Sequence, residues 1–328
     1  MKKWVIWLSV ALFIVIASGC GNDEASGGAK DDKPAKIVLD YAYYSPTSVV
    51  LKKFGWAEEA FKEDGIDIEF VLSQGSNKAL EFLNSSSVDF GSTAGAAALI
   101  AKANGAPIES VYIYSKPEWT ALLTTGDAPL STVEDLKGKK VAAAIGTDPH
   151  IFLLRSLSEA GLKASDVEIV NLQHADGGSA LTTGQVDAWA GLDPHMAKLE
   201  LEADTKFLYR NPEFNTYGTL NVRNEFAEKY PDQVKKVIEA YEKARQWVLD
   251  NPEEAAKILA EEAQITEQVA EKEMERNDFS NPIPGEDQKT ALTAAGEVLQ
   301  KEGIIKSDNL EELVDGLINP AFSEEVIK

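Results

Sequence analysis

The chain has 328 residues, of which 44% are hydrophobic, and a formal net charge of -22 at pH 7. This acidity argues against binding to nucleic acid or to an anionic lipid surface. Cys20 is the only cysteine, which excludes a disulfide framework and thiol catalysis in the rest of the chain.

The first 20 residues have the order of a secretory signal. Met1-Lys2-Lys3 precedes an apolar run over residues 4–17, which is shorter than the roughly 20 residues of a membrane span. Ala17-Ser18-Gly19-Cys20 resembles the lipobox of bacterial lipoproteins, in which the cysteine is lipidated and becomes the mature N-terminus. We expect a lipoprotein signal peptide over 1–20 and an extracytoplasmic protein that Cys20 anchors to the cell membrane. The alternative is an incidental cysteine beside a plain signal or N-terminal anchor.

Residues 21–35 are small and charged without apolar periodicity, which predicts a flexible tether. Alternation of apolar residues from Lys36 then predicts the first strand. Further strands are expected at 66–72, 88–91, 111–114, 119–124, 141–145 and 219–223. Helices are expected at 77–83, 94–103, 149–160, 232–249, 252–262, 266–276 and 287–301, and a capping box at Ser131 and Glu134. This alternation predicts an α/β protein with largely parallel sheets.

Two segments of the chain resemble each other loosely. Leu83-Asn-Ser-Ser-Ser-Val88-Asp89 and Leu181-Thr-Thr-Gly-Gln-Val186-Asp187 have the same spacing of apolar and acidic residues. Each ends a short predicted helix and begins a strand. The simplest interpretation is two lobes built on one strand–helix–strand scheme.

Motifs for catalysis are missing from the sequence. It contains no Gly-x-Ser-x-Gly elbow, no P-loop and no His-Glu-x-x-His. The histidines, His150, His174 and His195, could form a metal site with Asp193, but they lack the close spacing of paired ligands. We expect no metal, no cofactor and no enzymatic activity.

Small polar residues cluster where predicted strands pass into helices. They are Gln74-Gly75-Ser76, Gly91-Ser92-Thr93-Ala94-Gly95 and Gly146-Thr147-Asp148-Pro149. Hydroxyls and free N–H groups at helix N-termini bind anions, and ligands dock at the carboxyl ends of strands in open α/β sheets. Tyr43, Tyr44 and Trp189 could supply an apolar wall, with at least one of the two tyrosines turned away. Helix capping alone is the alternative for each turn.

Four stretches of the sequence are similar to the substrate-binding lipoproteins of ABC importers, within their sulfonate, taurine and nitrate group. They are Val88–Thr93, Asp135–Val141, Leu153–Leu162 with the preceding His150, and Val186–Pro194. The last resembles the Val-Asp-Ala-Trp-x-x-x-Asp-Pro signature of aliphatic sulfonate binders. Thiamine-precursor binders share the fold, but the chain lacks their Cys-rich motif.

The resemblance implies a two-lobed periplasmic-binding-protein-like fold of type II, with each lobe a mostly parallel sheet flanked by helices. The first lobe would combine residues 36–125 and 218–328, and the second would be 126–217. Carried over by position, the cleft residues are Tyr43, Tyr44, Ser45, Gln74, Gly75, Ser76, Ser92, Thr93, Thr147, Asp148, His150, Trp189 and Asp193. Ala94-Gly95 replaces a more polar continuation, and Asp148 would place a negative charge beside the anion unless it caps a helix or meets a cationic ligand group.

The expected function is therefore capture of a small sulfonate-like anion, an aliphatic sulfonate or taurine, and its delivery to an ABC permease with its ATPase. Nitrate or a pyrimidine or aromatic compound stacked on Trp189 and Tyr43 is the alternative ligand. An extracellular enzyme on the same fold is a third hypothesis, and the sequence offers no nucleophile–base pair for it.

Overall fold

A computed structural model describes residues 33–327. The expected signal peptide, the expected lipidation site Cys20 and most of the expected tether lie outside the described residues. Strand β1 begins at Lys36, as the alternation predicts, and the preceding Lys33 pairs with Asp64 at 2.8 Å. In the part of the chain that is described, no helix is both long enough and apolar enough to cross a membrane.

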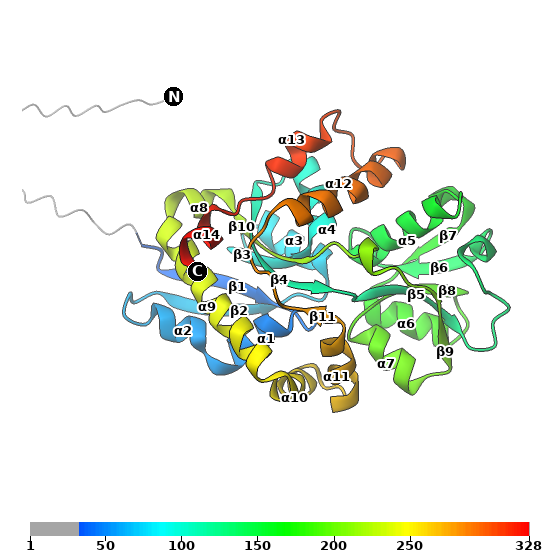
Figure 1. Cartoon of the computed structure of the whole chain (residues 1–328), viewed down its shortest axis with the longest axis horizontal. Coiled ribbons are helices and arrows are strands. Elements are labelled where there is room, and N and C mark those ends of the chain that lie inside the picture. The colour runs from blue at the N-terminus through cyan, green and yellow to red at the C-terminus, as the bar shows by residue number, and fades with distance from the viewer. Residues whose placement is uncertain (1–32, 328) are drawn as a thin grey trace, which may run out of the picture. The chain divides into compact units, whose positions relative to one another are not determined.

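Two sheets form the framework (Figure 1). The first has the strand order β11-β4-β10-β3-β1-β2, and the second has the order β7-β6-β8-β5-β9. In each sheet a parallel group is followed by antiparallel strands. We call the first sheet with the helices packed on it the first lobe, and the second sheet with its helices the second lobe.

The strands of the first sheet are β1 Lys36–Tyr41, β2 Asp67–Leu72, β3 Phe90–Ala94, β4 Ile108–Pro117, β10 Gly218–Arg223 and β11 Asn277–Asp278. Those of the second are β5 Thr120–Thr125, β6 Lys140–Ala143, β7 Glu168–Asn171, β8 Ala188–Leu192 and β9 Thr205–Tyr209. β5 falls within the range expected for the first lobe, yet it pairs with β8 and β9 of the second sheet. The chain therefore crosses between the sheets at 118–119, before the expected boundary at 125, and it returns over 210–217.

The helices of the first half are α1 Pro46–Phe54, α2 Trp56–Phe61, α3 Ser76–Asn84, α4 Gly95–Ala103, α5 Asp148–Glu159, α6 His174–Thr182 and α7 His195–Glu202. Those of the second half are α8 Asn224–Lys229, α9 Pro231–Asp250, α10 Pro252–Ala263, α11 Glu267–Glu275, α12 Glu286–Lys301, α13 Leu310–Asp315 and α14 Ala321–Val326. Short 3-10 turns lie at Val133–Leu136, Ala164–Asp166 and Pro212–Phe214. The predicted capping box is displaced by one residue, because Asp135 instead of Glu134 accepts from the N–H groups of Ser131 and Thr132.

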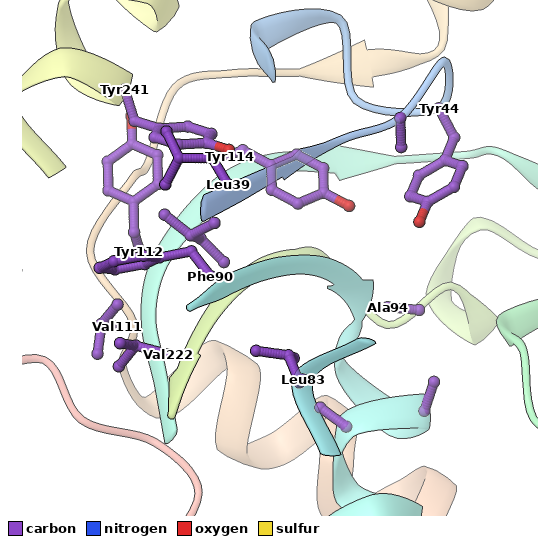
Figure 2. Close-up of a cluster of buried hydrophobic side chains, with 14 of the residues drawn as sticks. Leu39, Tyr44, Leu83, Phe90, Ala94, Val111, Tyr112, Tyr114, Val222 and Tyr241 are labelled. Carbon is purple, nitrogen blue, oxygen red and sulfur yellow. The ribbon is translucent and has the colours of Figure 1, made fainter. Parts of the chain in front are cut away.

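Hydrophobic residues fill the faces of both sheets. In the second lobe α5 covers one face and α6 and α7 cover the other, so its sheet is buried on both sides. In the first lobe the helices also pack on both sides of the sheet (Figure 1). Figure 2 shows the interior of this lobe, where Leu39, Phe90 and Val222 from three neighbouring strands meet Tyr241 of α9. Buried parallel strands read as continuous apolar runs, which is why the sequence predicts them well.

Candidate functional site

A cavity of about 310 Å³ lies between the two lobes. The first lobe contributes the turn after β1 and the turn between β2 and α3. The second lobe contributes the end of β8 and the beginnings of α6 and α7. Its lining residues are Tyr43, Tyr44, Ser73, Gln74, Gln173, His174, Ala175, Asp176, Leu192, Asp193, Pro194 and His195. These segments follow the carboxyl ends of strands, where open α/β sheets bind ligands.

Helices α6 and α7 begin at this cavity, and the turn before α3 reaches it through Gln74. Helix α3 follows the N-cap Gly75, α6 follows Gln173 and α7 follows Pro194, and none of these residues makes a side-chain capping bond. The first N–H groups of a helix lack partners within it and carry the positive end of its dipole. Among residues 33–327, no lysine or arginine side chain lines the cavity. Because the lining also includes Asp176 and Asp193, donors for an anion come only from backbone N–H groups and neutral side chains.

His174 is the lining residue with the most unused hydrogen-bonding capacity. It is only 2% exposed, and neither ring nitrogen has a hydrogen-bond partner among the described residues. Burial lowers the pKa of His174 to about 3, so the ring is neutral at pH 7 and offers one donor and one acceptor. The neighbouring Gln173 Oε1 is likewise buried without a partner. Because buried polar atoms are nearly always hydrogen-bonded, this pair indicates a place for a bound molecule.

Other ionisable groups surround the same cavity. Burial lowers the pKa of His195, so this ring also favours its neutral form. Asp193 is fully buried, and burial raises its pKa to about 6 even though Arg276 opposes this shift. Although His174, His195 and Asp193 all line the cavity, no group of three or more histidine, cysteine, aspartate or glutamate residues within 33–327 could hold a metal ion.

Both tyrosines of the predicted wall line the cavity. Tyr44 is 5% exposed; its hydroxyl donates to the carbonyl of Ser92 at 2.9 Å, and its ring meets Trp119 edge-on at 5.8 Å. Tyr43 is half-buried and meets Tyr41 edge-on at 6.3 Å. The alternation of strand side chains does not separate them, because β1 ends at Tyr41 and both residues lie in the following turn.

Gly75 and Gln74 approach the second lobe. Gln74 lines the cavity, and a Cβ atom added at Gly75 would lie 2.8 Å from Nε2 of His174. Of the predicted site residues, the structure thus brings together Tyr43, Tyr44, Gln74, Gly75 and Asp193.

Five predicted hydroxyl residues are buried outside the lining: Ser45, Ser76, Ser92, Thr93 and Thr147. Ser92 and Thr93 belong to β3, because this strand continues to Ala94 where the sequence predicted a turn. The Ser76 hydroxyl accepts from the N–H of Ala94 at 2.9 Å, and the Thr147 hydroxyl donates to the carbonyl of Ala144 at 2.6 Å. The hydroxyls of Ser76 and Thr147 therefore bind backbone groups outside the lining.

Asp148 connects the two crossing segments instead of lining the cavity. One carboxylate oxygen accepts from the indole N–H of Trp119 at 2.8 Å and from the Thr216 N–H at 3.1 Å. The other accepts from the Thr216 hydroxyl at 2.6 Å. Burial raises the pKa of Asp148, and the three donors compensate for its lost hydration. The negative charge expected beside the ligand is therefore bound by donors of the crossing segments.

Trp189 and His150 also lie away from the lining. Trp189 is fully buried in the core between the second sheet and α6, where Gly177 leaves room for its indole. A stacking role for Trp189 is not supported by this position. His150 is 7% exposed in the first turn of α5, and burial lowers its pKa to about 4.

The sequence interpretation missed Ser73 and the groups that begin α6 and α7. It weighed His174 and His195 as metal ligands against surface or cleft histidines, favoured the latter, and named neither among the ligand-binding residues. The internal repeat contained the missing signal, because Leu172-Gln173-His174 follows β7 as Gln74-Gly75-Ser76 follows β2. Extending the repeat upstream of Leu181 would have placed both turns at the same cavity.

Known proteins resemble this chain over most of its length. The model of the NMT1/THI5-like family matches residues 55–255. A putative aliphatic sulfonates-binding protein of Bacillus subtilis is 28% identical over 99% of this chain and 98% of its own length. One of the same description from Escherichia coli is 31% identical over 71% of this chain and 73% of its own length.

Solved structures give the same grouping. The alkanesulfonate-binding protein SsuA from Xanthomonas axonopodis pv. citri, solved with MOPS, superposes with a TM-score of 0.79 and 26% identity, covering 86% of this chain and 98% of that one. The relatives also include an enzyme by name, a yeast 4-amino-5-hydroxymethyl-2-methylpyrimidine phosphate synthase that is 29% identical over 60% of this chain and 62% of its own length. The fold is thus that of the periplasmic binding proteins, and the chain belongs to the NMT1/THI5-like family.

Proposed function

We propose that this protein is an extracytoplasmic receptor that captures a small sulfonate-like anion, an aliphatic sulfonate or taurine, and delivers it to an ABC permease. The single observation that carries the proposal is the cavity itself, where helix N-termini meet the unpartnered, neutral His174. Sulfonate oxygens are acceptors, and backbone N–H groups and a neutral imidazole supply donors without a fixed cation. The relatives named as sulfonate-binding proteins support the same ligand class.

Binding would work by closing the lobes on the ligand. The first lobe offers Tyr43, Tyr44 and Gln74, whereas the second offers His174 and His195. A ligand that contacts both sets favours the closed arrangement by its differential affinity. The segments that would bend are the crossings at 118–119 and 210–217, on either side of the Asp148 carboxylate. No bond is made or broken in this role.

We further propose that Cys20 carries the lipid anchor. Two or more acyl chains hold a protein stably at a membrane, since each buried CH₂ contributes about 0.8 kcal/mol. Metabolic labelling with a palmitate analogue, with Cys20→Ser as the control, tests this proposal. Labelling that persists in Cys20→Ser would contradict it.

A melting screen tests the ligand class. Alkanesulfonates, taurine, sulfate, nitrate and a hydroxymethylpyrimidine are each added to the purified protein. A true ligand at a hundredfold excess over its Kd stabilises the folded state by about 2.7 kcal/mol. We expect a shift with a sulfonate, and its loss in His174→Leu. Absence of a shift with every sulfonate would overturn the proposal.

The pyrimidine is included because the name of the yeast relative favours it as a second candidate. It would stack on Tyr43, which is half-buried at the cavity. A shift with the pyrimidine alone that disappears in Tyr43→Ala would favour this second ligand. Turnover of any bound candidate by the purified protein would favour an enzyme instead.

A further inference from the structure

Arg276 reaches from the first lobe into the second. It follows the last residue of α11, and the next residue, Asn277, pairs with Pro117 of β4 in the first sheet. Its carbonyl accepts from the N–H of Glu118 at 2.7 Å, which fixes its backbone at the first crossing between the sheets. Its side chain is only 6% exposed. The guanidinium is therefore held by the first lobe while its partners lie in the second.

Those partners both belong to one element, α7 and the residues that lead into it. Nη1 of Arg276 lies 3.0 and 3.1 Å from the two carboxylate oxygens of Asp193, and Nη2 binds Glu200 in the second turn of α7. Asp193 also accepts from the N–H of Ala197 at 2.8 Å. One guanidinium thus contacts the residue that caps α7 and a side chain further along the same helix.

The geometry of this contact restrains α7 strongly. A guanidinium is planar and donates along fixed directions, so its contacts to Asp193, just before α7, and to Glu200, within α7, define the orientation of that helix relative to the arginine. Asp193 is buried, so its charge is weakly screened by water. The nearby Glu273 makes no hydrogen bond to the guanidinium, since neither of its carboxylate oxygens has a partner among the described residues, and burial raises its pKa well above the ordinary value.

The restrained end of α7 is the end that opens into the cavity. Asp193, Pro194 and His195 all line it. We propose that Arg276 is a positioning residue for ligand binding, which holds the N-terminus of α7 at the cavity and against the first lobe. The proposed function supplies the ligand for this inference, but the position of α7 can be measured without one.

The chain offers a matched control in Arg210. It makes a two-pronged ion pair with Glu118 at 2.8 and 2.9 Å, and its guanidinium lies over the ring of Phe207, as that of Arg276 does. However, Arg210 is 44% exposed, and its carboxylate partner does not line the cavity. Arg210→Met removes a similar side chain at the same surface without touching α7.

The experiment compares Arg276→Met, Arg276→Lys and Arg210→Met. Removing one partner of a buried charge pair acts mainly on dissociation, so we expect Arg276→Met to raise the Kd for a sulfonate by roughly 10- to 100-fold through a faster off-rate. Arg276→Lys keeps the charge and should recover part of the affinity. Arg210→Met removes an exposed ion pair between the crossing segments without touching α7, so we expect it to raise the Kd at least threefold less than Arg276→Met does.

Hydrogen exchange without ligand provides the second measurement. Amides at the start of α7, Met196 and Ala197, should exchange faster in Arg276→Met than in Arg210→Met. If Arg276→Met does not fold, Glu200→Gln replaces it. We expect the same faster exchange and the same rise in Kd in this variant, but smaller than in Arg276→Met. Equal exchange and equal Kd in the two arginine variants would overturn the positioning role. A wild-type protein that binds no sulfonate would overturn the proposed function alone, since the exchange comparison still stands.

Discussion

The two lobes are variations on one strand–helix–strand unit. β1, β2 and β3 take the same places in the first sheet as β6, β7 and β8 in the second, and an antiparallel strand follows in each. The repeated aspartates have the same role. Asp89 accepts from the N–H of Val38 at 2.9 Å and returns its own N–H to the Val38 carbonyl, and Asp187 does the same with Lys140. The predicted internal repeat is confirmed by these contacts.

The lobes differ in how they fill the space between the equivalent strand and helix. β3 has Gly91 where β8 has Trp189, counted from the repeated aspartate. In the first lobe Leu83 occupies the space beside Gly91, whereas in the second lobe Gly177 of α6 leaves space for the indole. The first lobe thus has a small residue on the strand and a large one on the helix, and the second lobe has the reverse. The two residues together fill the space in each lobe, because protein cores are close-packed.

They also differ in what they offer a ligand. The hydroxyls of Ser45, Ser76 and Ser92 in the first lobe are buried outside the lining, and this lobe presents Tyr43, Tyr44, Ser73 and Gln74. The second lobe presents two helix N-termini and the unpartnered His174. The comparison teaches that the first lobe provides the aromatic wall with Ser73 and Gln74 beside it, whereas its copy provides the helix N-termini and the unpartnered imidazole.

The largest effect is expected from Trp189→Ala. Removing a fully buried indole from the second lobe should lower the free energy of unfolding by about 3–5 kcal/mol, measured by urea denaturation. Trp247→Ala is the control on the first lobe, since Trp247 is only partly buried beside Phe54 and Trp56 and should cost less. Unchanged stability with lost ligand binding would restore the stacking role that the sequence suggested.

The second prediction compares how Asp40 of the first lobe and His174 of the second lobe make the stability depend on pH. Burial raises the pKa of Asp40 in β1 to about 7, so the folded state binds more protons than the unfolded state between pH 4 and 7. This contribution to stability is lost as the pH rises through that window. Burial lowers the pKa of His174 to about 3, so its contribution is complete above pH 6.5 and is lost as the pH falls toward 3.

The two trends oppose each other between pH 4 and 6.5, so single variants should tilt the stability profile in opposite directions. Relative to the wild type, Asp40→Asn should lose more stability on acidification, because the opposing contribution of Asp40 is removed. Relative to the wild type, His174→Gln should lose less stability on acidification, because the contribution of the histidine is removed. Each tilt should amount to roughly 1–4 kcal/mol, measured by urea unfolding at several pH values. Parallel profiles in the two variants would contradict the assignment.

The sequence predicts the parts of this structure that depend on neighbouring residues better than those that depend on contacts between distant segments. Apolar periodicity placed β1, β10, α5 and α9 within one or two residues, because burial of a face leaves a direct mark on the chain. The cavity depends instead on which turns face each other across the lobes. Ser92 and Thr93 look like a helix-capping turn, and only pairing of β3 with β10 shows that they continue a central strand.

Asp148 is a second example of a contact that the local sequence does not predict. Its position after a Gly-Thr turn is that of a residue facing a ligand. Its actual donors, Trp119 and Thr216, are 29 and 68 positions away in the sequence. No local pattern encodes such a contact.

The third prediction tests whether the repeated aspartates are equally important. Asp89 is buried and also pairs with Arg223 at 2.6 Å, whereas Asp187 is exposed. Asp89→Ala should therefore lower the free energy of unfolding by about 2–3 kcal/mol, and Asp187→Ala by about 1 kcal/mol. Thermal and urea unfolding of both variants measure the difference. Equal losses would mean that the shared backbone contacts decide the effect, and that Arg223 adds nothing.

We expect the smallest effect on stability from Gly75→Ala, which should act on ligand binding instead. The φ of Gly75 is 161°, an extended value that any residue adopts, so the backbone is not strained by alanine. The added Cβ would lie 2.8 Å from Nε2 of His174, so the methyl group either displaces that ring or keeps the lobes apart. We expect the Kd for the ligand to rise about tenfold, with unfolding changed by less than about 0.5 kcal/mol.

Gly65→Ala is the opposite control for this variant. Gly65 has a φ of +67°, and no atom lies within 4 Å of the position that an added methyl group would take, so alanine there strains the backbone without touching the cavity. It should lower stability by about 1 kcal/mol and leave the Kd unchanged. If Gly75→Ala behaved like Gly65→Ala, the lobes would not close on His174. If Gly75→Ala weakened ligand binding without lowering stability, the absence of a side chain at Gly75 would be what allows His174 of the second lobe to reach the ligand.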